Sequence, residues 1–191
     1  MLVIDCCIRG DLSATRQYYK AYLATLAKPK DIEIVELSTL GLRSLDAEAL
    51  AERERLIAEH KYDAEAFRLA RQFRDADEII IAAPYWDLSF PSLLKTYFEH
   101  ICVSGLTFGY TEKGSEGYCR ATELLYFSTC GGFIGEQHLG FTYVESLGRM
   151  LGIDNCRAYT IEGLDIDPSK REHLLAQAIR QLNEQLTDGT E

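Results

Sequence analysis

A short apolar run near the middle of the chain, residues 78–83, constrains the fold more than any other segment. It reads Glu-Ile-Ile-Ile-Ala-Ala and shows almost no alternation between apolar and polar positions. A strand with one face in water alternates, so a strand without alternation is covered on both faces. The run therefore predicts a parallel strand in a sheet with helices packed on both sides.

Strand-like and amphipathic segments alternate along the rest of the chain. The segments that read as strands are residues 2–7, 32–37, 78–83, 123–127 and 156–160. Those with helical periodicity are residues 15–26, a charged pair of segments within 46–74, then 91–103, 141–151 and about 168–186. Helices between successive strands imply right-handed crossovers and a parallel sheet. We expect an α/β three-layer sandwich with five parallel strands in the order 2-1-3-4-5, which places the switch point between the first and third strands.

One segment interrupts this alternation. Residues 105–120 separate the helix that ends near residue 103 from the fourth strand, and they contain Lys113-Gly114-Ser115. Gly and Ser in such a triplet are turn residues. We expect a hairpin that turns there.

Composition limits the class of protein. The chain has 191 residues, 47% of them hydrophobic, with no Pro-, Gly- or Ser-rich linker, so we expect a single domain over residues 1–191. The formal net charge is −10 and the basic residues are unclustered, which argues against nucleic acid and anionic lipid as partners and favours a small molecule. With no membrane-length apolar run and no basic leader before the first strand, we expect a cytoplasmic protein that is not in the membrane.

The six cysteines and four histidines have no metal-binding spacing. There is no C-x-x-C pair, and the histidines are scattered, so we expect neither a zinc site nor a disulfide framework. The adjacent Cys6 and Cys7 could form a strained vicinal disulfide. Strand alternation that puts one of them into the core is the favoured interpretation, because the expected compartment is reducing.

The loop after the first strand has the features of a phosphate site. It runs from Cys7 through Arg9 to Ser13 and Thr15 and opens a helix. Helix-start amides, two hydroxyls that can face one point and a nearby guanidinium together suit a phosphate group. The alternative is that Asp11 or Ser13 is only an N-cap. Neither a G-x-x-x-x-G-K-[ST] nor a G-x-G-x-x-G pattern occurs, so a monophosphate fits better than a triphosphate or a dinucleotide.

Two further loops follow strands that should end at the same edge of the sheet. Tyr85 and Trp86 come directly after Pro84 at the end of the third strand, a position that favours lining a flat ring over ordinary packing. Gly131 and Gly132 follow the fourth strand, where they allow a ligand to approach the backbone and offer amides to a carbonyl oxygen.

The chain resembles the FMN-dependent NAD(P)H oxidoreductases of the flavodoxin-like fold, in particular the azoreductase and NAD(P)H quinone reductase branch, over most of its length. The family's A-P-M-Y-N-F motif corresponds to residues 83–88, and the Q-L-K that follows it to residues 93–95. Its S-R-G-G loop corresponds to residues 129–132. The most specific match is between residues 104–114 and R-A-G-x-T-F-x-Y-T-E-x-G, because no general structural requirement fixes that string.

The resemblance implies the positions that bind ligands. The phosphate of FMN is assigned to the first loop, through Cys7, Arg9, Ser13 and Thr15. The isoalloxazine ring is assigned to the second loop, through Pro84, Tyr85, Trp86, Asp87 and Leu88. The other carbonyl edge of the flavin is assigned to Ser128, Thr129, Cys130, Gly131 and Gly132. The acceptor pocket is assigned to Phe108 and Tyr110, in this family commonly across a homodimer interface.

The implied activity is flavin-mediated reduction in two half-reactions. NADH or NADPH donates a hydride, leaves, and is replaced by a quinone, azo or nitroaromatic acceptor. No side chain acts as acid or base, and no metal is needed. Three positions depart from the family pattern: Cys7 replaces Ser, Asp87 replaces Asn, and Cys130 replaces Arg or a small polar residue. These changes bear on the redox potential and on the range of substrates.

Two alternatives belong to other functional classes. A flavodoxin-like electron carrier would bind FMN and pass single electrons to a protein, although the hairpin at residues 105–120 argues against it. The second alternative is a ligand-binding member of the fold that has lost FMN. The departures at Cys7, Asp87 and Cys130 make this alternative conceivable.

Overall fold

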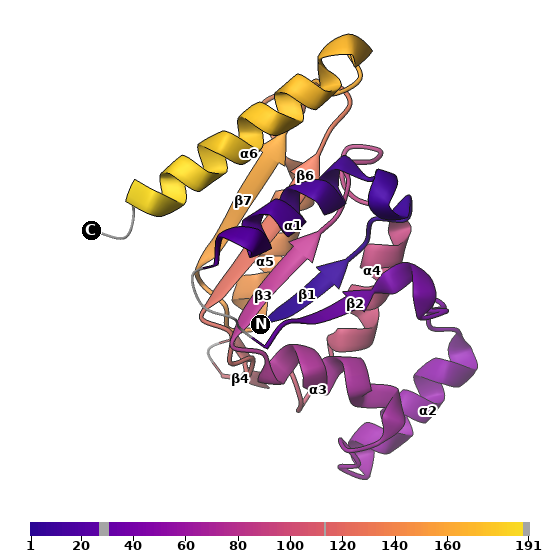
Figure 1. Cartoon of the computed structure of the whole chain (residues 1–191). Coiled ribbons are helices and arrows are strands. Elements are labelled where there is room, and N and C mark those ends of the chain that lie inside the picture. The colour runs from indigo at the N-terminus through magenta and orange to yellow at the C-terminus, as the bar shows by residue number, and fades with distance from the viewer. Residues whose placement is uncertain (27–30, 113, 189–191) are drawn as a thin grey trace.

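The computed structural model describes residues 1–26, 31–112 and 114–188, and its centre is a five-stranded parallel sheet (Figure 1). The strands of this sheet are β1 (Leu2–Asp5), β2 (Glu33–Glu36), β3 (Glu78–Ala82), β6 (Glu123–Thr129) and β7 (Cys156–Ile161). Their order is β2-β1-β3-β6-β7, and every neighbouring pair is parallel. The expected α/β sandwich and its strand order are confirmed.

Helices cover both faces of this sheet, as the apolar run predicts. The helices are α1 (Ala14–Thr25), α2 (Ala47–Ala58), α3 (Arg68–Asp75), α4 (Ser92–Ile101), α5 (Leu139–Met150) and α6 (Arg171–Asp188). In Figure 1, α1 and α6 lie on the near face of the sheet and α5 lies behind it. The chain therefore forms the layers helix, sheet, helix.

The core divides into two clusters because successive strand residues point to opposite faces. One cluster contains Ile79 and Ile81 with apolar residues of α3, α4 and α5. The other contains Ile80 with residues of α1 and α6, including Tyr18 and Leu182. All three isoleucines of β3 are 1% exposed, which explains the absence of alternation in this segment.

Cys6 and Cys7 extend the same alternation beyond the end of β1. Cys6 packs in the first cluster and Cys7 in the second, so both are buried, and both thiols are free. The expectation that only one enters the core is wrong because both faces of the sheet are covered by helices. Cys6 N–H still donates to the Ala82 carbonyl at 2.8 Å.

The excursion before the fourth sheet strand is the expected hairpin. Strands β4 (Phe108–Thr111) and β5 (Gly114–Gly117) pair antiparallel. Lys113, expected in the turn, lies outside the described residues. Gly114 and Ser115, also expected in the turn, instead belong to β5, where they pair with Thr111 and Tyr110. Gly117 packs directly on the end of α5, where a Cβ would lie 1.9 Å from the Leu151 carbonyl carbon. This contact fixes the hairpin against the body of the domain.

Some element boundaries differ from expectation by a few residues. The closing helix begins as a 3-10 turn, Pro168–Lys170, because Asp167 caps it by accepting from Ser169 N–H, and α6 proper follows at Arg171. Across the described ranges, no helix combines the length and apolar content that a bilayer crossing requires.

Candidate functional site

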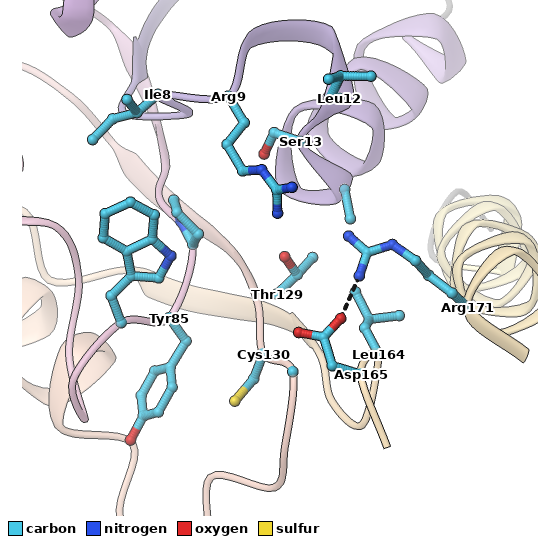
Figure 2. Close-up of a pocket in the computed structure, with 14 residues that line it drawn as sticks. Ile8, Arg9, Leu12, Ser13, Tyr85, Thr129, Cys130, Leu164, Asp165 and Arg171 are labelled. Carbon is cyan, nitrogen blue, oxygen red and sulfur yellow. Dashed lines mark hydrogen bonds and ion pairs between the residues drawn. The ribbon is translucent and has the colours of Figure 1, made fainter. Parts of the chain in front are cut away.

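Backbone hydrogen bonds tie together the loops that leave the carboxyl ends of the strands. Tyr85 N–H, just after β3, donates to the Thr129 carbonyl of β6 at 2.9 Å. Cys130 N–H donates to the Ile161 carbonyl of β7 at 2.7 Å, and Leu164 N–H donates back to the Cys130 carbonyl at 3.1 Å. Together with the β1–α1 loop, these segments surround one pocket at the switch point of the sheet (Figure 2).

The β1–α1 loop brings a helix start to this pocket. Gly10 has a φ of +59°, a left-handed conformation that glycine adopts without cost, and it begins the 3-10 turn Gly10–Leu12. Ser13 is the N-cap of α1, and its Oγ accepts from Arg16 N–H at 3.4 Å. Ser13 also lines the pocket. The two interpretations of this residue, cap and ligand contact, are therefore compatible.

A buried ionic network lies beneath the same loop. The Asp5 carboxylate, 1% exposed, accepts from Cys7 N–H at 2.7 Å and from the Tyr19 hydroxyl at 2.8 Å. Arg16 Nε lies 2.8 Å from Asp5 Oδ2, and its Nη2 donates to Glu36 at 3.1 Å. The network fixes the loop at two points. One is the backbone N–H of Cys7, and the other is Arg16 in the first turn of α1.

Positive charge enters the pocket from two sides. Figure 2 shows the guanidinium groups of Arg9 and Arg171 directed into the same space, with Ser13 nearby. Arg171 Nη1 donates to Asp165 Oδ1 at 2.6 Å. Within the described part of the chain, Arg9 makes no salt bridge. The end of the pocket next to α1 is therefore suited to an anion.

The loop after β3 ends in a tight turn with unusual backbone angles. Trp86 N–H donates to the Ser89 carbonyl at 3.2 Å, and Ser89 N–H donates to the Trp86 carbonyl at 2.8 Å. Both residues between them have positive φ, 50° at Asp87 and 66° at Leu88, as a type I′ turn requires. Asp tolerates this conformation, whereas Leu is strained in it. Trp86, 41% exposed, lines the pocket next to this turn.

The loop after β6 is held from two directions. Thr129 Oγ1 lies 2.7 Å from Thr15 Oγ1 of α1, and both residues are buried. Gly131 allows the β7–α6 loop to come close, since a Cβ at this position would lie 2.3 Å from Asp165 Oδ2. Burial raises the pKa of the Cys130 thiol, so at neutral pH it is protonated.

Several residues from the sequence analysis line the pocket and others do not. Those that line it are Arg9, Ser13, Pro84, Tyr85, Trp86, Thr129, Cys130 and Gly131. Cys7 does not, because its thiol points into the core and donates to the Ala82 carbonyl at 3.8 Å. The Ser128 side chain is fully buried. Thr15 lies behind Thr129. The remaining expected residues are also outside the pocket lining: Asp87, Leu88 and Gly132.

The residues expected in the acceptor pocket lie on the hairpin. Phe108 is 9% exposed and packs in the core, with its ring centroid 5.5 Å from that of Tyr110. Tyr110 is 77% exposed. Neither lines the pocket formed by the strand-end loops of the single chain, and their role in binding an acceptor stays a prediction.

The sequence analysis missed the residues that the β7–α6 loop contributes. Leu164, Asp165 and Arg171 all line the pocket. The signal was available, because the carboxyl ends of parallel strands meet at one edge of the sheet and residues 162–171 follow the fifth strand. Two apolar residues of the first loop, Ile8 and Leu12, were also missed. No group of three or more His, Cys, Asp or Glu side chains in the described ranges is arranged to hold a metal ion.

Comparison with known families agrees with this geometry. A family model described as flavodoxin-like fold matches residues 1–186. The chain belongs to this family. The relatives include FMN-dependent NADH:quinone oxidoreductase 2 of Clostridium acetobutylicum, 35% identical over 164 residues that cover 83% of this chain and 82% of the relative. FMN-dependent NADH:quinone oxidoreductase 3 of Pseudomonas fluorescens is 31% identical and covers 97% of both chains.

Solved structures show the same flavodoxin-like fold. An azoreductase from Bacillus anthracis aligns with a TM-score of 0.81 at 23% identity and covers 96% of this chain and 95% of its own. An FMN-dependent NADH-azoreductase from Bacillus anthracis, in complex with FMN, aligns with a TM-score of 0.82 at 22% identity, covering 100% and 98%. The family model and the curated relatives confirm the family resemblance, and the solved structures confirm the fold.

Proposed function

We propose that the protein is an FMN-dependent NADH:quinone oxidoreductase with azo and nitroaromatic compounds as further acceptors. The observation that carries this proposal is the pocket at the switch point, which joins an anion-binding end to an aromatic wall. The named activities of the two curated relatives, which align over most of this chain, support the same conclusion. They favour NADH as the donor.

The pocket has the chemistry that FMN requires at both ends. Arg9, Arg171 and the capped start of α1 at Ser13 suit the phosphate dianion. Tyr85 and Trp86 supply aromatic surface for the flat ring. The backbone N–H groups of Asp87 and Leu88 make no backbone hydrogen bond within the residues described, so they are available to a ligand.

In the proposed mechanism the protein positions the reactants and excludes water. FMN, when bound, would supply the hydride chemistry between NADH and the acceptor. Arg9 and Ser13 would hold its phosphate. Tyr85, Trp86, Thr129 and Gly131 would line the space for its ring. The Cys130 thiol stays protonated and adds no charge to this space.

Assembly and location are part of the proposal. We infer a homodimer, because Tyr110, 77% exposed on the hairpin, offers an aromatic surface that a second copy would cover while completing the acceptor site. We place the protein in the cytoplasm as a single domain. Its six free cysteines fit a reducing compartment.

A visible absorption spectrum of the purified protein and a flavin fluorescence titration test the proposal. We expect FMN to bind and the complex to oxidise NADH when a quinone is added. Ser13→Ala should weaken FMN binding by about tenfold or more, since one hydrogen bond to a charged group is lost. Ser169→Ala, at an exposed position on the 3-10 turn before α6, is the matched control and should leave binding unchanged.

Two results would contradict the proposal, each in favour of one alternative. A colourless protein that ignores added FMN would indicate a member of the fold that has lost the cofactor. A protein that binds FMN but oxidises no NADH with any quinone would indicate an electron carrier.

A further inference from the structure

Arg171 occupies a position in the pocket that the β1–α1 loop cannot supply. It is the first residue of α6 and reaches the pocket from the wall opposite Arg9 (Figure 2). Its side chain is 35% exposed, so it is partly removed from solvent. An anion between Arg9 and Arg171 would be contacted by a guanidinium on each side.

The Arg171 side chain is held in place by Asp165. Nη1 of Arg171 donates to Asp165 Oδ1 at 2.6 Å. Asp165 is itself fixed, because its backbone N–H donates to the Gly131 carbonyl at 2.9 Å and its carboxylate lies against the Cα of Gly131. One nitrogen of the guanidinium is used in this pair. The remaining N–H groups of Arg171 are free to bind a ligand, since a guanidinium has five donors.

The charges lining the pocket explain why a second arginine is needed. Asp165 brings one negative charge to the anion-binding end, and Arg9 alone would only balance it. Arg171 restores an excess of one positive charge, which a phosphate dianion requires for net attraction. Without Arg171, the end of the pocket would be close to neutral.

We propose that Arg171 is a second phosphate-binding residue that makes the pocket select a phosphorylated flavin over riboflavin, with Asp165 as its positioning residue. This inference rests on the proposed function, because it assigns the phosphate of FMN to the space between Arg9 and Arg171. Arg171 contributes to affinity through the phosphate alone and has no contact with the ring.

The test compares FMN and riboflavin binding in three variants by flavin fluorescence titration. Arg171→Gln removes the charge and should weaken FMN binding by about tenfold or more, while riboflavin binding changes less than about twofold. Arg171→Lys keeps the charge but loses the planar fork, and it should fall between wild type and Arg171→Gln. Lys170→Gln is the matched control, because Lys170 is exposed, neighbours Arg171 and lies outside the pocket lining. It should leave both affinities unchanged.

Competition by inorganic phosphate provides a second measurement. Phosphate in the millimolar range should weaken FMN binding to the wild type and compete less well in Arg171→Gln. Thermal unfolding of each apoprotein establishes that the variants are folded. If Arg171→Gln fails to fold, the inference is tested by FMN binding to Arg171→Lys and by phosphate competition in the wild type.

Equal loss of FMN and riboflavin binding in Arg171→Gln would overturn the inference, because it would show that Arg171 only holds the loop. Unchanged FMN binding in Arg171→Gln would also overturn it, while leaving the proposed function intact. If the wild type binds no flavin at all, the proposed function itself fails.

Discussion

Leu88 shows how a single residue can be strained by the turn that it completes. Its φ of 66° is in the left-handed region, and its side chain is 65% exposed, so little packing offsets the strain. A non-glycine residue held in this region costs about 1–3 kcal/mol. Strain of this size at the rim of the pocket indicates that the turn geometry, rather than the leucine side chain, is what the site requires.

Replacing Leu88 by glycine should therefore stabilise the protein. We expect Leu88→Gly to raise the free energy of unfolding by about 1 kcal/mol, since the relief of strain exceeds the entropic cost of glycine. Leu12→Gly is the control, because Leu12 is 78% exposed but has no positive φ, and it should be neutral or destabilising. Urea unfolding of the apoproteins measures the free energy of unfolding of both variants. A Leu88→Gly variant less stable than wild type would show that the leucine packs in a way that offsets its strain.

Asp5 is the residue on which the buried network depends. Asp5→Asn would leave Arg16, whose side chain is 7% exposed, with the partly exposed Glu36 and the exposed Asp11, at 3.9 Å, as its ion-pair partners. We expect a loss of about 2–4 kcal/mol in the free energy of unfolding, because a buried charge loses its closest partner. Asp11→Asn removes an exposed carboxylate that pairs with Lys20 at 3.1 Å and, more distantly, with Arg16 at 3.9 Å, and it should cost less than about 1 kcal/mol. Similar losses in the two variants would refute the structural role given to the network.

At the scale of elements, α5 begins with an unusual cap that responds to pH. The His138 ring accepts from Phe141 N–H through Nδ1 at 3.1 Å, so this nitrogen carries no proton and the neutral ring carries its proton on Nε2. Burial lowers the pKa of His138. Protonation would place a second N–H against the Phe141 amide and break the cap.

The stability that His138 provides should therefore be lost in acid. Its pKa is lower in the folded than in the unfolded chain, so the unfolded chain takes up the proton first as pH falls below about 6.5. His138→Asn keeps a capping oxygen but does not titrate. We expect the stability of wild type relative to His138→Asn to decrease between about pH 7.5 and 5.5. A difference in stability between wild type and His138→Asn that does not change with pH would exclude the cap as a titrating element.

At the scale of the whole molecule, the two ends of the sheet differ in function. The carboxyl ends of β1, β3, β6 and β7 carry the pocket, and the loops there are joined by backbone hydrogen bonds across the sheet. The hairpin β4–β5 packs on the end of α5, and it exposes Tyr110 to solvent. We propose that this exposed aromatic belongs to the contact surface of a homodimer.

A homodimer built on the hairpin should be visible in solution. Light scattering at micromolar concentration should give a mass twice that of one 21.6 kDa chain. Tyr110→Glu should shift the mass toward that of one chain, because a charge is costly to bury in an apolar interface. Circular dichroism of the variant monitors folding. A wild type with the mass of one chain would contradict the homodimer.

The sequence alone determined the layers, the strand order and most of the first and second loops. These follow from local patterns: the absence of alternation at Ile79 to Ile81, helical periodicity between strands, and hydroxyls at the start of a helix. The positions of Arg9, Ser13 and Trp86 at the pocket follow from the rule that parallel strands end at one edge. Each of these conclusions depends on residues close together in the chain or on one topological rule.

Only the tertiary structure determined which side chains line the pocket. Thr15 and Thr129 are 114 positions apart, and their hydroxyl pair turns Thr15 away from the pocket. Cys7 points into the core because both faces of the sheet are covered, and Arg171 enters the pocket because Asp165 docks on Gly131. Such contacts depend on how loops far apart in the sequence pack against one another, and local residue patterns carry no information about that packing.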